Sequence, residues 1–209
     1  HIDGFRFDLM GVLDIETLNE ARKALLKINP DIIMYGEGWT GGESTLPESE
    51  RGMKINAPRT PGIGMFSDDI RDAVKGHVFY MDELGFVNGA ADRGEELKQA
   101  VTCAKWAKSP MQSINYLSCH DNYTLWDRFI ISNSHESEEM RIRMNKLAAA
   151  ILFTAQGIPF FLHGEEFART KISEADGAPV ENSYCSPLSV NAIDYDRAEQ
   201  FSDLKAYYK

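Results

Sequence analysis

Residues His1–Gly11 read HIDGFRFDLMG, an apolar run that carries an arginine and an aspartate two residues apart. Because side chains alternate along a strand with a period of two, Arg6 and Asp8 should point to the same face. A guanidinium favours the ionised form of a neighbouring carboxylate, and a fixed, ionised carboxylate can act as a nucleophile. A buried ion pair with a purely structural role is the alternative. The apolar residues that indicate a short buried strand are Ile2, Phe5, Phe7 and Leu9.

Two later stretches also consist of an apolar run that ends in polar, titratable residues. Asp31–Trp39 reads DIIMYGEGW and closes on Glu37, and Ser113–Asn122 reads SINYLSCHDN and closes on His120 and Asp121. Buried parallel strands that each deliver a carboxylate at their carboxyl end are typical of the active site of a (β/α)8 barrel. The recurrence therefore predicts an α/β fold with parallel strands and helices outside them.

The same stretches resemble the type I pullulanases, the debranching subgroup of the α-amylase superfamily of glycoside hydrolases. GFRFDLMG, YGEGW and YLSCHDN are similar to three ordered sequence regions of that superfamily. The runs that narrow the resemblance to pullulanases are GIGMFSDDIRDAVKG (62–76), SPMQSINYLSCHDNYTLWDR (109–128), GIPFFLHGEEFARTK (157–171) and NSYCSP (182–187). The resemblance implies hydrolysis of α-1,6-glucosidic links in pullulan and branched α-glucans by a retaining double displacement.

The resemblance also implies a role for each candidate residue. Asp8 would be the nucleophile, Glu37 the general acid and then the general base, and Asp121 a third carboxylate that stabilises the transition state. Arg6 would keep Asp8 ionised. Burial at the end of its strand, next to Trp39, should raise the pKa of Glu37. The residues expected to contact the α-glucan substrate are Arg6, Trp39, His120, Tyr123 and His163.

Composition limits the other classes of function. The 209 residues carry 22 basic and 32 acidic side chains, a net charge of −10, which argues against nucleic acid or an anionic membrane surface as partner. No apolar run approaches the roughly 20 residues needed to span a bilayer. Three scattered cysteines indicate neither a disulfide scaffold nor a zinc site. Asp68, Asp69 and Asp72 lack the spacing of a calcium-binding loop, so we expect no metal site there. We also expect no cofactor. The compartment of the protein, cytoplasmic or secreted, stays open.

Periodicity predicts about five strands that alternate with helices or loops. The clearest helix is expected over 138–156, and a second helix follows an N-cap at Asp14 and ends before Asn29-Pro30. Trp126 is expected in the core, and Cys119 as a buried thiol within a strand. The other expected elements are strands over 32–36, 63–66, 113–119 and 158–163, helices over 67–75, 95–108 and 193–209, and a long loop over 40–64.

By the resemblance, residues 1–209 are one partial catalytic domain that holds strands four to eight of the barrel. The first three strands and the β modules of the family are absent from it, and we expect His1 to be a cut or a boundary. An open sheet of five strands leaves edges uncovered, so the remainder of the barrel or a second copy should be needed. Two alternatives stay open: a non-catalytic glucan-binding or structural fragment, and a related amylase or glucanotransferase.

Overall fold

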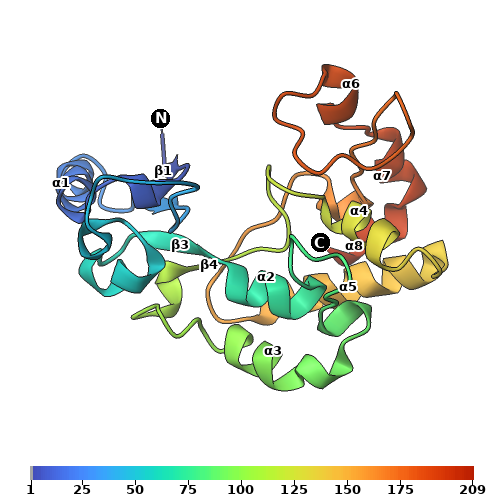
Figure 1. Cartoon of the computed structure of the whole chain (residues 1–209), viewed down its shortest axis with the longest axis horizontal. Coiled ribbons are helices and arrows are strands. Elements are labelled where there is room, and N and C mark those ends of the chain that lie inside the picture. Colours follow the sequence, from blue (N-terminus) through green and yellow to red (C-terminus); the bar gives the residue numbers. More distant parts are fainter. Residues whose placement is uncertain (1) are drawn as a thin grey trace. The chain divides into compact units, whose positions relative to one another are not determined.

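The computed structural model describes residues 2–209 and has an α/β architecture with five strands in one parallel sheet, in the order β1-β2-β3-β4-β5. Figure 1 labels β1, β3 and β4 among them. The strands are β1 (Gly4–Phe7), β2 (Ile33–Gly36), β3 (Gly64–Ser67), β4 (Ser113–Asn115) and β5 (Ile158–Pro159). The register is fixed by pairs such as Arg6–Tyr35, Gly36–Met65 and Phe66–Ile114. The predicted fold class is confirmed, because sequential parallel strands are joined by helix-containing crossovers.

Contacts between Cα atoms divide the chain into two compact units. Unit 1 comprises residues 1–67, 102–115 and 156–158, and it holds the sheet up to the first residue of β5. Unit 2 comprises residues 68–101, 116–155 and 159–209, and it is mainly helical. Each unit has its own hydrophobic core.

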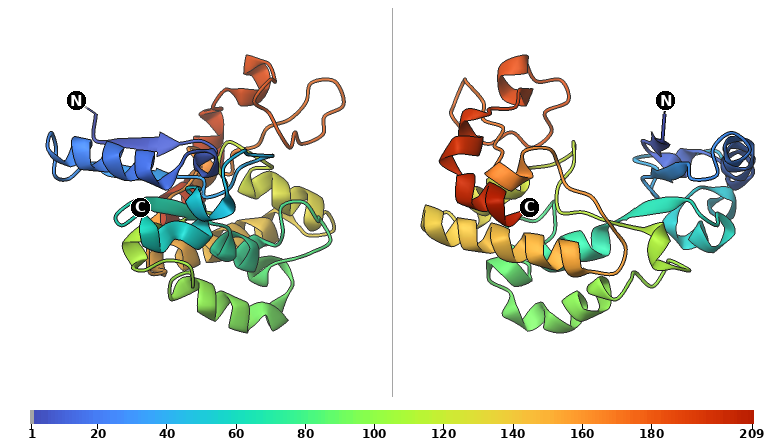
Figure 2. Two further views of the ribbon diagram at one scale, coloured as in Figure 1. Left: turned by 60° about the vertical axis from the view of Figure 1, so that its left-hand side comes forward. Right: turned by 180° about the vertical axis from the view of Figure 1, so that it is seen from behind.

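In unit 1, α1 (Ile15–Leu26) covers one face of the sheet, as both views in Figure 2 show for the blue helix and strand. The helix begins because Asp14 accepts a hydrogen bond from the N–H of Thr17, which confirms the predicted N-cap. Its apolar side packs on the methionines of β2 and β3. The fully buried members of this core are Met10, Leu18, Met34, Ala57, Ile63 and Met65. The 3-10 helices of unit 1 are η1 (Met10–Val12), η2 (Glu48–Glu50), η3 (Lys54–Arg59) and η6 (Pro110–Gln112).

Unit 2 is built around α5 (Glu138–Thr154), drawn in yellow and orange in Figure 1, which confirms the clearest predicted helix. Its buried residues Met144, Ala148 and Leu152 pack with residues of α2, α3 and α4 in one core. A second core contains Trp126, as predicted from the sequence, together with Phe167 and Phe201. The helices of unit 2 are α2 (Asp68–Lys75), α3 (Gly94–Val101), α4 (Leu125–Ser132), α5, α6 (Leu188–Asn191), α7 (Asp196–Gln200) and α8 (Ser202–Tyr207), with η4 (Phe86–Asn88), η5 (Ala91–Arg93) and η7 (Glu165–Phe167).

Several predicted elements are shorter than the sequence indicated. The helix expected over 95–108 ends at Val101, and Cys103 then takes a φ of 105°, which a helix cannot contain. The strands expected to reach 119 and 163 end at Asn115 and Pro159, so Cys119 lies outside a strand and is only half-buried. The last expected helix is two short helices that meet at Phe201.

The expectation of a buried first strand is wrong for β1 within the described residues. β1 lies at the edge of the sheet, and Ile2 and Phe5 are 66% and 37% exposed. Apolar composition indicates that a segment favours burial, but it does not tell whether a neighbouring strand is there to bury it. His1 itself lies outside the described residues.

Candidate active site

Unit 1 brings three of the predicted site residues together at the carboxyl ends of β1 and β2. Arg6 pairs with Tyr35 in the parallel register, and Phe7 with Gly36, so Asp8 and Glu37 are the next residues along the two strands. The period of two then places Arg6, Asp8 and Glu37 on the same face. A carboxylate oxygen of Asp8 and one of Glu37 lie within 4.8 Å of each other.

One guanidinium holds both carboxylates. Arg6 donates from Nη1 to Oδ1 of Asp8 at 2.9 Å and from Nη2 to Oε1 of Glu37 at 2.5 Å. The Glu37 side chain is 1% exposed, whereas that of Asp8 is 60% exposed. The predicted Arg6–Asp8 pair is therefore present, and the same arginine also binds the second acid, which the sequence pattern alone did not indicate.

The second carboxylate oxygen of Glu37 is fixed by the backbone. The N–H of Leu9 donates to Oε2 of Glu37 at 2.9 Å. This bond and the Arg6 ion pair favour the ionised carboxylate, while burial favours the neutral acid. The expectation that burial raises the pKa of Glu37 stays a prediction, because these donors oppose the effect of burial.

The guanidinium of Arg6 lies over the aromatic ring of Phe66. The Arg6 guanidinium carbon lies 5.5 Å from the centre of the Phe66 ring, and Tyr35 meets Phe66 edge to face at 5.7 Å. Phe66 is 1% exposed and stands on β3, one strand away from Tyr35. The register explains the stack, because Arg6, Tyr35 and Phe66 share one face of the sheet.

Trp39 follows Glu37 by two residues and is half-buried. Lys54 places its ammonium 5.4 Å from the centre of the Trp39 ring, a distance suited to a cation–π contact. The carbonyl of Trp39 accepts a hydrogen bond from the N–H of Gly11 at 3.1 Å. Trp39, which was predicted to contact the α-glucan, is thus held by both its ring and its backbone, and Lys54 is a neighbour that the sequence did not reveal.

The remaining predicted residues belong to unit 2. His120 Nε2 lies 3.5 Å from Asp121 Oδ1, and their side chains are 45% and 44% exposed. Asn122 has a left-handed backbone with φ of 60°, and its N–H donates to Oδ1 of Asn182 at 3.0 Å. Unit 2 therefore pairs the predicted His120 and Asp121 beside a turn that Asn182 stabilises.

Tyr123 and His163 also lie in unit 2. Tyr123 is half-buried, and burial raises its pKa, with Glu181 and Asp127 adding to the effect. The His163 ring lies 6.3 Å from Phe167 and 6.0 Å from Tyr195. His163 is thus exposed on an aromatic cluster, which leaves its predicted role in substrate binding a prediction.

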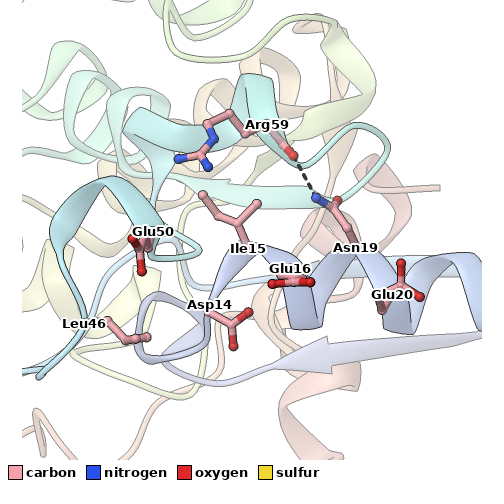
Figure 3. Close-up of a pocket in the computed structure, with 8 residues that line it drawn as sticks. All are labelled: Asp14, Ile15, Glu16, Asn19, Glu20, Leu46, Glu50 and Arg59. Carbon is pink, nitrogen blue, oxygen red and sulfur yellow. Dashed lines mark hydrogen bonds between the residues drawn. The ribbon is translucent and has the colours of Figure 1, made fainter.

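A pocket of about 690 Å³ lies elsewhere on unit 1, beside the first half of α1 (Figure 3). Asp14 in this pocket caps α1, which lowers the pKa of its carboxyl group, and Asn19 donates to the Arg59 carbonyl at 3.0 Å. These contacts join α1 to η3, so they stabilise unit 1. The lining residues are Asp14, Ile15, Glu16, Asn19, Glu20, Leu46, Glu50 and Arg59.

No helix among residues 2–209 combines the length and the apolar character that crossing a membrane would require.

Comparisons with known proteins identify the relatives of the chain. No family model matches it. The pullulanase of Bacillus subtilis (strain 168) is 40% identical over 210 residues, which cover 97% of this chain and 28% of that protein. The Klebsiella pneumoniae pullulanase is 31% identical over 242 residues, covering 93% of this chain and 21% of that protein.

Solved structures agree with these relatives. The Paenibacillus barengoltzii pullulanase, in complex with maltohexaose and α-cyclodextrin, is 46% identical with a TM-score of 0.91 and covers 100% of this chain and 32% of that one. The Anoxybacillus sp. LM18-11 pullulanase with maltotriose is 44% identical with a TM-score of 0.91, over 98% of this chain and 28% of that one. The chain therefore spans less than a third of the length of these relatives.

Proposed function

This chain is homologous to a segment of the pullulanases, the α-1,6-debranching glycoside hydrolases, and we propose that it carries the catalytic carboxylates of such an enzyme. The reaction proposed is hydrolysis of α-1,6-glucosidic links in pullulan and branched α-glucans with retention of configuration. The relatives are more than three times as long as the part that this chain matches, so the proposed activity is that of the whole enzyme to which such a segment contributes.

The observation that carries the proposal is the spacing of Asp8 and Glu37. Retaining glycosidases place their two carboxyl groups about 5–5.5 Å apart, whereas inverting enzymes need about 6.5–9.5 Å to admit a water molecule. The oxygens of Asp8 and Glu37 come within 4.8 Å, which supports retention. Arg6 binds both acids, so it also keeps them in this spacing.

In the first step, Asp8 attacks the anomeric carbon while Glu37 donates a proton to the oxygen of the leaving sugar. In the second step, Glu37 takes a proton from water, which attacks the same carbon and releases Asp8. Asp121 and His120 are proposed to bind the sugar ring and to stabilise positive charge in the transition state. Trp39, Tyr123 and His163 are proposed as further contacts to the α-glucan.

The experiment that tests the function compares pullulan and amylose as substrates of the full-length polypeptide. Release of maltotriose from pullulan is expected. Cleavage of linear amylose alone would contradict debranching and favour an amylase, and transfer of glucosyl units to an acceptor would favour a glucanotransferase. Binding of maltotriose without hydrolysis would favour the alternative of a non-catalytic glucan-binding segment.

Substitution of the acids tests their roles. Glu37→Gln is expected to lower kcat on pullulan by about 10²–10⁴-fold, the usual contribution of a general acid–base. Asp8→Ala should abolish the covalent intermediate and lower kcat at least as far, and Asp121→Asn should also impair turnover. Asp3→Asn is the matched control, because Asp3 is an exposed acid directly before β1. Losses of only a few fold for Asp8 or Glu37 would contradict the assignment.

A further inference from the structure

Leu9, which directly follows the proposed nucleophile, has an unusual backbone. Its φ of 45° and ψ of 46° lie in the left-handed region, which is unfavourable for a residue with a branched, apolar side chain. Such conformations persist only where the surrounding structure enforces them, and they gather at functional sites. The left-handed turn at Leu9 must therefore be enforced by its neighbours.

The turn is fixed by its contacts with the end of β2. The N–H of Gly11 donates to the carbonyl oxygens of Glu37 and Trp39, at 3.2 and 3.1 Å. A Cβ at Gly11 would lie 2.6 Å from the backbone of Trp39, so a larger residue could not approach so closely. Met10, between the two, is fully buried in the core of unit 1. Leu9 is thus held between an ordered strand end and an anchored 3-10 helix.

The side chain of Leu9 adds a further restraint. A Cβ at Gly41, which has a φ of 63°, would lie 2.8 Å from Cδ2 of Leu9. The glycine therefore lets the loop after Trp39 close over the leucine. Both the side chain and the backbone of Leu9 are therefore restrained by their neighbours, which explains how a left-handed leucine can persist here.

This turn aims the N–H of Leu9 at the proposed acid–base. The N–H reaches Oε2 of Glu37 at 2.9 Å, while Arg6 binds Oε1 at 2.5 Å, so both oxygens have a fixed donor. This N–H lies in the peptide plane between Asp8 and Leu9, and φ and ψ of Leu9 relate that plane to Met10, which is anchored in the core. An extended backbone at Leu9 could therefore not keep the N–H on Glu37 and Met10 in the core together. We propose that Leu9 is a positioning residue, whose left-handed backbone orients the Glu37 carboxylate and favours its ionised form; this rests on the proposed role of Glu37.

Two substitutions of Leu9 separate the backbone conformation from the side chain. Leu9→Asn and Leu9→Val both remove the leucine packing, but asparagine tolerates the left-handed region, whereas valine disfavours it. The full-length polypeptide is assayed on pullulan across pH. The valine variant should lose the N–H that donates to Glu37, and this loss should raise the pKa of the general acid. The alkaline limb of the pH profile of pullulan hydrolysis should therefore move to higher pH, and kcat should fall about tenfold. The asparagine variant should restore the position of the limb.

An alkaline limb at the same pH in both variants would overturn the proposal, even if both were less stable. A second readout does not depend on activity. The amide ¹⁵N shift of Leu9 should follow the titration of Glu37 and should change in Glu37→Gln, while the shift of Ile28, an exposed residue in the same unit, should not. An insensitive Leu9 amide would overturn the proposal if the valine variant failed to fold. A lack of pullulan hydrolysis together with a sensitive amide would refute the proposed function and leave the positioning of Glu37 supported.

Discussion

Glu165 and Lys75 are ionisable residues enclosed in unit 2, only 3% and 2% exposed. Burial raises the pKa of Glu165 to about 7, although the Ser118 hydroxyl, which donates to it, and Lys75 oppose the rise. Burial, together with the charge of the nearby Arg71, lowers the pKa of Lys75 to about 7. Both residues therefore titrate near neutrality, where an exposed glutamate or lysine would not.

The buried Glu165 carboxyl makes the stability of the fold depend on pH. Between the ordinary glutamate pKa of 4.5 and the folded-state pKa of about 7, the folded state keeps a proton that the unfolded state releases. The free energy of unfolding should therefore fall as pH rises through this window, by about 3 kcal/mol at most. Lys75 acts in the opposite sense above neutrality, because its pKa in the folded state lies below the ordinary lysine value of 10.5.

Glu165→Gln should remove the decline of stability between pH 4.5 and about 7. Urea midpoints of the protein at pH 5, 6 and 7 measure it, followed through the far-ultraviolet circular dichroism of the helices, which unit 2 mainly supplies. Glu174→Gln, at an exposed carboxylate of the same unit, is the control. A wild-type decline that persists unchanged in Glu165→Gln would mean that this buried acid does not cause it.

Sequence patterns correctly predicted those helices that local interactions determine. The capping carboxylate of Asp14 and the apolar periodicity of 138–156 define helices without help from distant residues, and both helices are present, the second one ending at Thr154. Strand length depends on which neighbours can pair, so the apolar runs after Ser113 and Ile158 predicted strands that continue beyond Asn115 and Pro159.

In the candidate site, too, local sequence patterns predicted some features, while others depend on distant parts of the chain. The period of two and the carboxyl ends of parallel strands were enough to place Arg6, Asp8 and Glu37 together. The contacts from Leu9 and Lys54 could not be predicted, because a left-handed leucine and a cation over Trp39 depend on the path of the chain in space. The glycines Gly11 and Gly41 are compatible with a tight turn at Leu9, but a glycine does not indicate that the Leu9 N–H binds Glu37.

The N-cap of α5 contributes to the stability of this helix. The Ser137 hydroxyl accepts a hydrogen bond from the N–H of Met140 at 3.1 Å, which satisfies an otherwise unpaired donor of the first turn. Ser137→Ala should lower the free energy of unfolding by about 1 kcal/mol, whereas Ser137→Asp, which can still cap, should lower it much less. Urea denaturation at one pH measures both. Equal losses in the two variants would show that the cap is not what stabilises the helix.

For the whole molecule, the important feature is that the sheet of unit 1 ends at β1. Phe5 on this strand and Ile33 on the next are 37% and 52% exposed, and an edge strand also offers unpaired backbone groups for pairing with another chain. The relatives are more than three times as long as the segment that this chain matches. Further chain is therefore expected to cover this edge in a complete enzyme.

The 209-residue chain on its own is accordingly predicted to self-associate through β1. Light scattering coupled to size exclusion should show a mass that rises with concentration, and Phe5→Lys should shift the population toward the monomer, because a charge at an edge strand opposes edge-to-edge pairing. Ile55→Lys is the matched control, since Ile55 is 71% exposed in η3 of the same unit and lies outside the sheet. A monomer at every concentration, or equal effects of the two lysines, would show that the exposed edge does not drive association.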